Sequence, residues 1–197
     1  MRNKMDLLPT ASQTVGPFFH LGLTRDDQLV SRIAGPRAKG ERLRVSCRIL
    51  DGNGSPVNDA LIEIWQADAE GHYASLIEVP IKDQASDYAF LGFGRMPTNE
   101  DGCCEFETIK PGRVPGPGST LQAPHLTVAI FGRGMLKQLF TRVYFAGDTA
   151  LEEDPVLALV PREQQETLMA ISDPALSGRW LFEVRLQGER ETVFFDV

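Results

Sequence analysis

Apolar and polar side chains alternate along residues 43–50, LRVSCRIL, as is typical of a strand with one buried face. A strong turn sequence, DGNG at residues 51–54, follows directly. Further strand-like runs, separated by glycine- and proline-rich turns, lie at residues 60–65, 104–109, 125–131, 136–145, 180–186 and 192–195. Only residues 161–170, with proline first and Glu, Gln and Leu following, have a helical composition. The pattern predicts an all-β fold, a β-sandwich with one short helix.

A hairpin is expected where residues 125–131, HLTVAIF, and the run 136–145 are joined by Gly132-Arg133-Gly134. This places Arg133 at the tip, between glycines that permit unusual backbone angles. A guanidinium on a rigid turn is suited to binding a carboxylate. An ordinary exposed arginine is the alternative interpretation of the same residues.

The N-terminal residues 1–40 have no sustained helical or alternating pattern, but they contain the sequence TVGPFFH at residues 14–20. Aromatic residues are scarce in disordered tails, so Phe18 and Phe19 favour packing on a partner or on a site. We therefore predict an extended N-terminal arm, residues 1–40, and a β-sandwich core domain, residues 41–197.

Composition narrows the classes of function. The chain has 197 residues, a net charge of -7 and a pI near 5.0, which fits one domain and argues against a nucleic-acid partner. It has no apolar run long enough to span a membrane and no secretory signal pattern, so a cytoplasmic protein is expected. Three cysteines without metal-finger spacing are interpreted as reduced thiols, at least one of them in the core.

Candidate chemistry from the residues alone is sparse. None of the three histidines forms a His-x-His or His-x-x-x-His pair, so a structural role is the default for each. Nucleotide-binding glycine motifs and the serine-hydrolase elbow are absent from the sequence.

Several motifs resemble the intradiol ring-cleaving dioxygenases. Residues 61–73, LIEIWQADAEGHY, resemble that family's WQA-D-G-Y signature, and residues 101–112 and 123–125 resemble its core. The opening SQTVGPF at residues 12–18 and the closing GERETVFFD at residues 188–196 resemble the α subunit of two-chain members. The resemblance covers nearly the whole chain.

In that family the catalytic chain binds a non-haem ferric ion through two tyrosines and two histidines. The matching positions in this chain are Tyr73, Val114, His125 and Thr127. Val114 and Thr127 supply neither a phenolate nor an imidazole, so the resemblance implies a degenerate site with no metal in this chain. Two further positions depart from the catalytic pattern: Gln122 replaces an arginine and Arg142 replaces a glutamine.

The resemblance implies that a homologous β subunit carries the Fe(III), that αβ pairs form larger oligomers, and that no catalytic residue lies in this chain alone. It implies cleavage of protocatechuate with O2 to 3-carboxy-cis,cis-muconate in aromatic catabolism. The substrate-binding residues that carry over are Gly16, Pro17, Phe18, usually a tyrosine in the family, and Arg133. The alternatives are a self-sufficient catechol or hydroxyquinol dioxygenase and a transthyretin-like β-sandwich binding module without catalysis.

Overall fold

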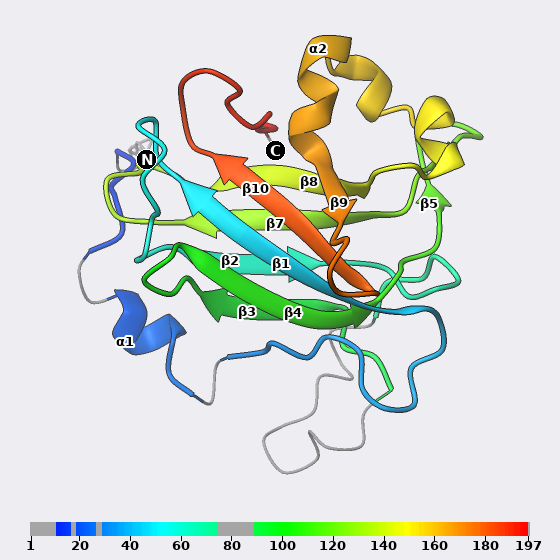
Figure 1. Ribbon diagram of the computed structural model, residues 1–197, viewed down its shortest axis with the longest axis horizontal. Coiled ribbons are helices and arrows are strands. Elements are labelled where there is room, and N and C mark those ends of the chain that lie inside the picture. The colour runs from blue at the N-terminus through cyan, green and yellow to red at the C-terminus, as the bar shows by residue number, and fades with distance from the viewer. Residues whose placement is uncertain (1–10, 17–18, 27–28, 75–88, 197) are drawn as a thin grey trace, which may run out of the picture.

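The computed structural model describes residues 11–16, 19–26, 29–74 and 89–196 (Figure 1). Its strands are β1 (Arg42–Leu50), β2 (Leu61–Trp65), β3 (Phe93–Pro97), β4 (Cys103–Ile109), β5 (Val114–Pro115), β6 (Leu121–Gln122), β7 (His125–Phe131), β8 (Leu139–Phe145), β9 (Met169–Ser172) and β10 (Arg179–Arg185). Its helices are the α-helices α1 (Phe19–Leu23) and α2 (Arg162–Gln165) and the 3-10 helices η2 (Thr149–Glu153), η3 (Leu157–Leu159) and η4 (Glu166–Leu168). Among the described residues, no helix has the length and apolar composition needed to cross a membrane.

Eight strands form one nearly closed sheet in the order β3-β2-β7-β8-β9-β10-β1-β4, and β5 pairs separately with β6. The large sheet folds into two facing layers, with β10, β1 and β4 lying over β8, β7, β2 and β3 (Figure 1). Strand β9 joins the layers, because it pairs in parallel with β8 and antiparallel with β10. The predicted all-β sandwich is confirmed.

The open edges of this sheet, β3 and β4, are joined by residues 30–34. Val30 exchanges two backbone hydrogen bonds with Arg95 of β3, both 2.9 Å long. Three residues on, the Ile33 N–H donates to the Glu107 carbonyl of β4 at 2.8 Å, and the Ile33 side chain is fully buried. The end of the arm is therefore part of this chain's own sandwich, and packing of the arm on a partner stays a prediction.

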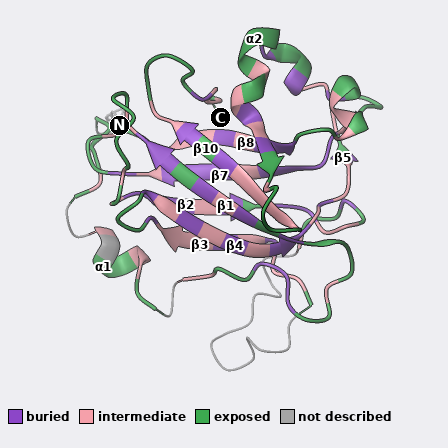
Figure 2. Cartoon of the chain, in the orientation of Figure 1, coloured by how far each residue is buried: buried purple, intermediate pink, exposed green. Residues whose placement is uncertain are grey.

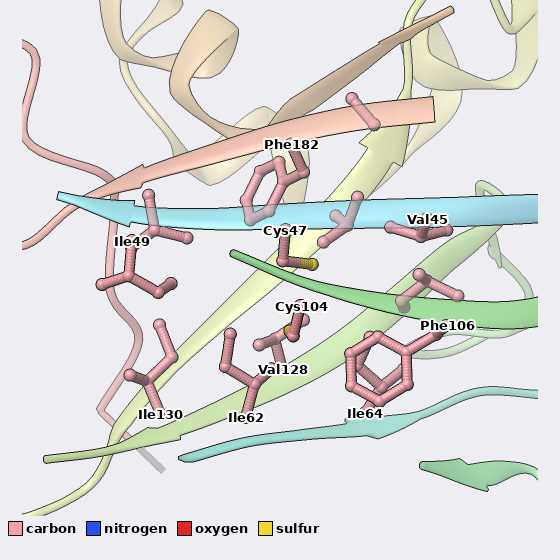
Figure 3. Close-up of a cluster of buried hydrophobic side chains, with 14 of the residues drawn as sticks. Val45, Cys47, Ile49, Ile62, Ile64, Cys104, Phe106, Val128, Ile130 and Phe182 are labelled. Carbon is pink, nitrogen blue, oxygen red and sulfur yellow. The ribbon is translucent and has the colours of Figure 1, made fainter. Parts of the chain in front are cut away.

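The core lies between the two layers, and Figure 2 shows that buried residues follow the strands. The inward-facing side chains labelled in Figure 3 are Val45, Cys47, Ile49, Ile62, Ile64, Cys104, Phe106, Val128, Ile130 and Phe182. Burial of each large aliphatic side chain is worth roughly 1.5 to 3 kcal/mol. Cys47 and Cys104 are buried and oppose each other across the β1–β4 ladder, and all three cysteines are free, which confirms the prediction of a cysteine in the core.

Alternation predicted β1 correctly, and β7 has the predicted bounds. The predicted strand at residues 192–195 is wrong, because there only Phe195 forms an isolated bridge, with Phe140. The predicted helix 161–170 is too long: helical structure ends with η4, and Met169 begins β9. Met169 and Ala170 pair with the end of β8, so long-range pairing overrides the local helical composition. Strand β3 was not predicted because Gly94 interrupts its pattern. A Cβ at Gly94 would lie 2.8 Å from the Phe106 ring, so close packing requires glycine there.

Candidate functional site

The outward side of the β7–β8 pair carries the polar residues that the sequence singled out. Alternation along β7 directs its aliphatic side chains into the core and leaves His125 and Thr127 on the opposite face. On β8, Arg142 and Tyr144 share that face. The antiparallel register sets His125 opposite Tyr144 and Thr127 opposite Arg142, so two remote sequence segments form one polar cluster.

Arg142 lies at the centre of this cluster. Its Nη1 donates to Oε1 of Gln122 at 2.7 Å and to Oη of Tyr144 at 3.3 Å. The guanidinium carbon lies 6.0 Å from the centre of the Phe195 ring, within the range of a cation–π contact. Within the described ranges, no carboxylate forms an ion pair with Arg142. Its positive charge is therefore held by neutral oxygens and an aromatic face.

A buried carboxylate, Asp154, anchors the cluster from behind. Its Oδ2 accepts from the Ala123 N–H at 2.6 Å, and its Oδ1 accepts from the N–H groups of Val156 and Leu157 at 2.9 and 2.7 Å. Oδ1 also accepts from the Tyr144 hydroxyl at 3.2 Å. Because a buried charge is costly unless it is hydrogen-bonded, these four contacts account for an Asp154 that is only 1% exposed.

The charge of Arg142 acts on three titratable neighbours. Burial raises the pKa of Tyr144 to about 12 and also raises the pKa of Tyr73, and Arg142 opposes both shifts. Burial lowers the pKa of His125 to about 4, and Arg142 acts in the same direction. The Nδ1 of His125 donates to the Ala123 carbonyl at 2.8 Å. Near neutral pH the cluster therefore contains a neutral imidazole and two protonated phenols around one guanidinium.

A tight turn after β2 places Tyr73. Oδ1 of Asp68 accepts hydrogen bonds from the N–H groups of Glu70 and His72, both 2.9 Å long, which closes the turn. A β-bridge between Ala67 and Tyr73 then fixes the chain direction. The Tyr73 side chain remains 56% exposed, so it lies at the open side of the cluster.

The residues of this cluster do not fit a ferric ion. Val114 is buried and offers no donor atom, and Thr127 offers only a neutral hydroxyl. The fixed positive charge of Arg142 lies beside the two remaining candidate ligands, Tyr73 and His125, where it opposes a cation. Among the described residues, no group of three or more His, Cys, Asp or Glu side chains is placed to hold a metal.

A second cluster forms at the tip of the β7–β8 hairpin. Nε of Arg133 donates to Oδ2 of Asp59 in an ion pair, and the Arg133 side chain is 59% exposed. Gly134 has a φ of 86°, which favours glycine, and its N–H donates to Oγ1 of Thr14 at 2.8 Å. This bond holds Thr14 of the arm against the hairpin tip.

The structure thus separates the predicted residues into two groups. The degenerate positions that surround Arg142 are Tyr73, Val114, His125 and Thr127. Arg133 lies at the hairpin tip, while Pro17 and Phe18 are outside the described residues. Sequence reasoning missed Asp59 and Asp154, because the contacts that bring Asp154 into the cluster, with Ala123 and Tyr144, depend on the fold. Asp59 could be linked to Arg133 only once the strand register is known. Both residues then lie two positions beyond the last pair of the β2–β7 ladder.

Comparison with known proteins identifies the family. The family model described as Dioxygenase matches residues 14–188. The dioxygenase domain of a dioxygenase–carbohydrate-binding fusion protein from Streptomyces sp. SirexAA-E has a similar structure, with a TM-score of 0.62, 25% identity, and coverage of 91% of this chain and 99% of that chain. The chain belongs to the intradiol ring-cleavage dioxygenase family.

Within the family, the chain is similar to one kind of subunit over its full length. The protocatechuate 3,4-dioxygenase alpha chain of Pseudomonas putida is 38% identical over 98% of both chains. That of Burkholderia cepacia is 40% identical over 97% of this chain and 98% of its own length. The beta chain of the Burkholderia cepacia enzyme is 34% identical, over 81% of this chain and 65% of the beta chain.

We predict that tyrosine at position 114 and histidine at position 127 do not restore iron binding while Arg142 remains. The double variant Val114→Tyr/Thr127→His should bind little iron, because the guanidinium lies beside the restored ligands. Adding Arg142→Gln should raise the iron content toward about one ion per chain and produce a tyrosinate-to-iron absorption band. Iron analysis and visible spectra of purified chains measure both.

The wild-type chain and the single variant Arg142→Gln are the controls for this series, and both should be nearly free of iron. Equal iron in the double and triple variants would show that Arg142 does not oppose the metal. About one iron per wild-type chain would contradict the degenerate site itself.

We also predict that His125 makes stability depend on pH. Its pKa is about 4 in the folded chain and 6.5 when unperturbed, so the unfolded chain binds the additional proton between these values. Stability from this residue is therefore present above pH 6.5 and is lost as the pH falls toward 4, by about 2 to 3 kcal/mol. Urea unfolding across this window should give a flatter pH dependence for His125→Gln. An unchanged slope in His125→Gln would refute the prediction.

Proposed function

We propose that this chain is the α subunit of a protocatechuate 3,4-dioxygenase, which cleaves protocatechuate with O2 to 3-carboxy-cis,cis-muconate. The similarity to the α chains over the full length supports this assignment, and the similarity to a β chain supports a homologous partner. In this proposal αβ pairs assemble into larger oligomers in the cytoplasm. The three free cysteines are compatible with that compartment.

The proposal assigns the Fe(III) to the β subunit and substrate positioning to this chain. When bound there, the ferric ion supplies coordination of the two catechol oxygens. The Arg142 cluster supports this division of labour, because it offers a fixed cation where a metal-binding chain needs anionic and imidazole ligands. This chain would then complete and seal the partner's pocket without activating oxygen.

The observation that carries the proposal is the position of Arg133. Its guanidinium projects from the tip of a hairpin whose two strands are held by a continuous ladder. Planar guanidinium groups bind carboxylates through two charge-assisted hydrogen bonds, and protocatechuate carries a carboxylate that catechol lacks. Arg133, with Gly16, Pro17 and Phe18 of the arm, is therefore proposed to contact the substrate bound at the partner's iron.

Co-expression with the homologous β subunit provides the test. Alone, neither iron nor dioxygenase activity is expected in this chain, whereas the co-purified complex should cleave protocatechuate. A complex that forms but remains inactive with iron-loaded β subunit would favour a binding module. Activity of this chain alone would favour a self-sufficient dioxygenase.

We predict that Arg133→Ala in the assembled enzyme lowers kcat/KM for protocatechuate by roughly 30-fold, equivalent to about 2 kcal/mol. The loss lies at the small end for a charge pair because Arg133 is exposed to water. Catechol cleavage should change little, because catechol never makes the contact. Steady-state kinetics on both substrates measure the difference.

Arg133→Lys is the matched control, since lysine keeps the charge but lacks the planar fork. It should recover only part of the specificity for protocatechuate. An equal loss for both substrates in Arg133→Ala would assign Arg133 to folding or assembly.

A further prediction concerns the arm. Deleting residues 1–20 should weaken assembly with the β subunit or raise KM for protocatechuate, because it removes Thr14 from the hairpin tip together with the predicted aromatic contacts. Residues 30–34 remain in this deletion, so the sandwich itself should stay folded. Size-exclusion chromatography and kinetics of the co-expressed complex measure the two effects. An unchanged oligomer with unchanged kinetics would show that the arm has neither role.

A further inference from the structure

Beside the hairpin tip lies a residue with no assigned role, Asp59, which precedes β2 and contacts Arg133. The last pair of the β2–β7 ladder is Leu61 with Phe131, and Asp59 and Arg133 lie two residues beyond it on either strand. Continuation of the same antiparallel register sets these two side chains opposite each other. The ion pair from Nε of Arg133 to Oδ2 of Asp59 is therefore a cross-strand pair fixed by the sheet.

We propose that Asp59 is a positioning residue, which orients the Arg133 guanidinium so that its terminal amino groups face the carboxylate of the substrate. This inference rests on the proposed function, because it requires Arg133 to bind that carboxylate. Asp59 itself makes no contact with substrate in the proposal.

The donor inventory of Arg133 supports this orientation. Asp59 accepts from Nε, and within the described part of the chain neither Nη1 nor Nη2 of Arg133 donates a hydrogen bond to a protein group. The two terminal amino groups form an end-on fork that matches the two oxygens of a carboxylate. The ion pair thus holds one edge of the guanidinium and leaves the other edge available.

Asp59 has two opposing effects on an anionic ligand. Its negative charge partly neutralises Arg133, which weakens attraction for a carboxylate, while its contact orders a long side chain before binding. Both side chains are substantially exposed, so water screens the charge effect. Ordering is then the larger effect, and removal of Asp59 should weaken substrate binding about three- to tenfold.

The exposure of this pair also separates positioning from folding. The Asp59 and Arg133 side chains are 36% and 59% exposed, and ion pairs this open contribute little to stability. The Asp59→Asn variant should therefore fold, assemble and melt like the wild-type protein. Its defect should appear only with a substrate that carries a carboxylate.

The experiment uses the complex of this chain with its co-expressed β subunit. Asp59→Asn should raise KM for protocatechuate about three- to tenfold, with kcat within about twofold of wild type and catechol kinetics unchanged. Asp59→Glu should recover most of the loss, because it restores a carboxylate partner. In the Arg133→Ala background, Asp59→Asn should add nothing further, since the residue acts through Arg133.

A second ion pair provides the matched control, because one of its partners lies on the β7–β8 loop that also carries Arg133. Lys137 contacts Asp196 at 2.6 Å, and both side chains are largely exposed. Asp196→Asn removes the same kind of charge from the same part of the molecule and should leave KM for protocatechuate unchanged. A similar rise in KM for Asp196→Asn would mean that net charge, and not orientation of Arg133, causes the effect.

The outcomes distinguish this inference from the function on which it rests. If Arg133→Ala affects both substrates equally, the carboxylate contact of the proposed function is wrong. If Arg133→Ala is selective for protocatechuate but Asp59→Asn leaves KM unchanged or lowers it, the contact stands and the positioning role of Asp59 is overturned.

Discussion

The pairing of β7 with neighbours on both of its edges is the constraint on which the rest of the molecule depends. Strand β2 binds one edge and β8 binds the other, so the register of β7 is fixed twice. A slip of one residue would exchange its core face with its outward face. Apolar packing of the β7 core face therefore also places His125 and Thr127, and the same ladder delivers Arg133 to the hairpin tip.

Sequence patterns predicted the sheet better than the connections. Alternation predicted β1, which buries one face, and an apolar run of strand length predicted β7, which is mostly buried. Sequence patterns did not predict β9. Its pairing with β8 spans only two residue pairs and depends on distant segments coming together. A local propensity for helix was correct up to Leu168 and failed at Met169, where that long-range pairing begins.

The sequence predicted which residue types occupy the candidate site, but not the hydrogen bonds between them. Val114 and Thr127 could be recognised as missing ligands from the sequence, and Arg142 as a departure from the family pattern. The hydrogen bonds from the Arg142 guanidinium to Gln122 and Tyr144 could not be predicted from the sequence, because they depend on the register of β8 and the position of β6. The structure shows how a cluster without suitable metal ligands satisfies its polar groups. Gln122 and Tyr144 accept hydrogen bonds from Arg142, while the Tyr144 hydroxyl donates to Asp154.

The bridge that residues 30–34 make between β3 and β4 affects the tendency of this protein to aggregate. Unpaired strand edges are templates for pairing with other chains and promote aggregation. In this fold the two edges are covered by backbone hydrogen bonds from the segment that follows the arm. Detachment of Val30 and Ile33 would uncover both edges and an apolar side chain together. The root of the arm thus acts as a protective cover for the sheet.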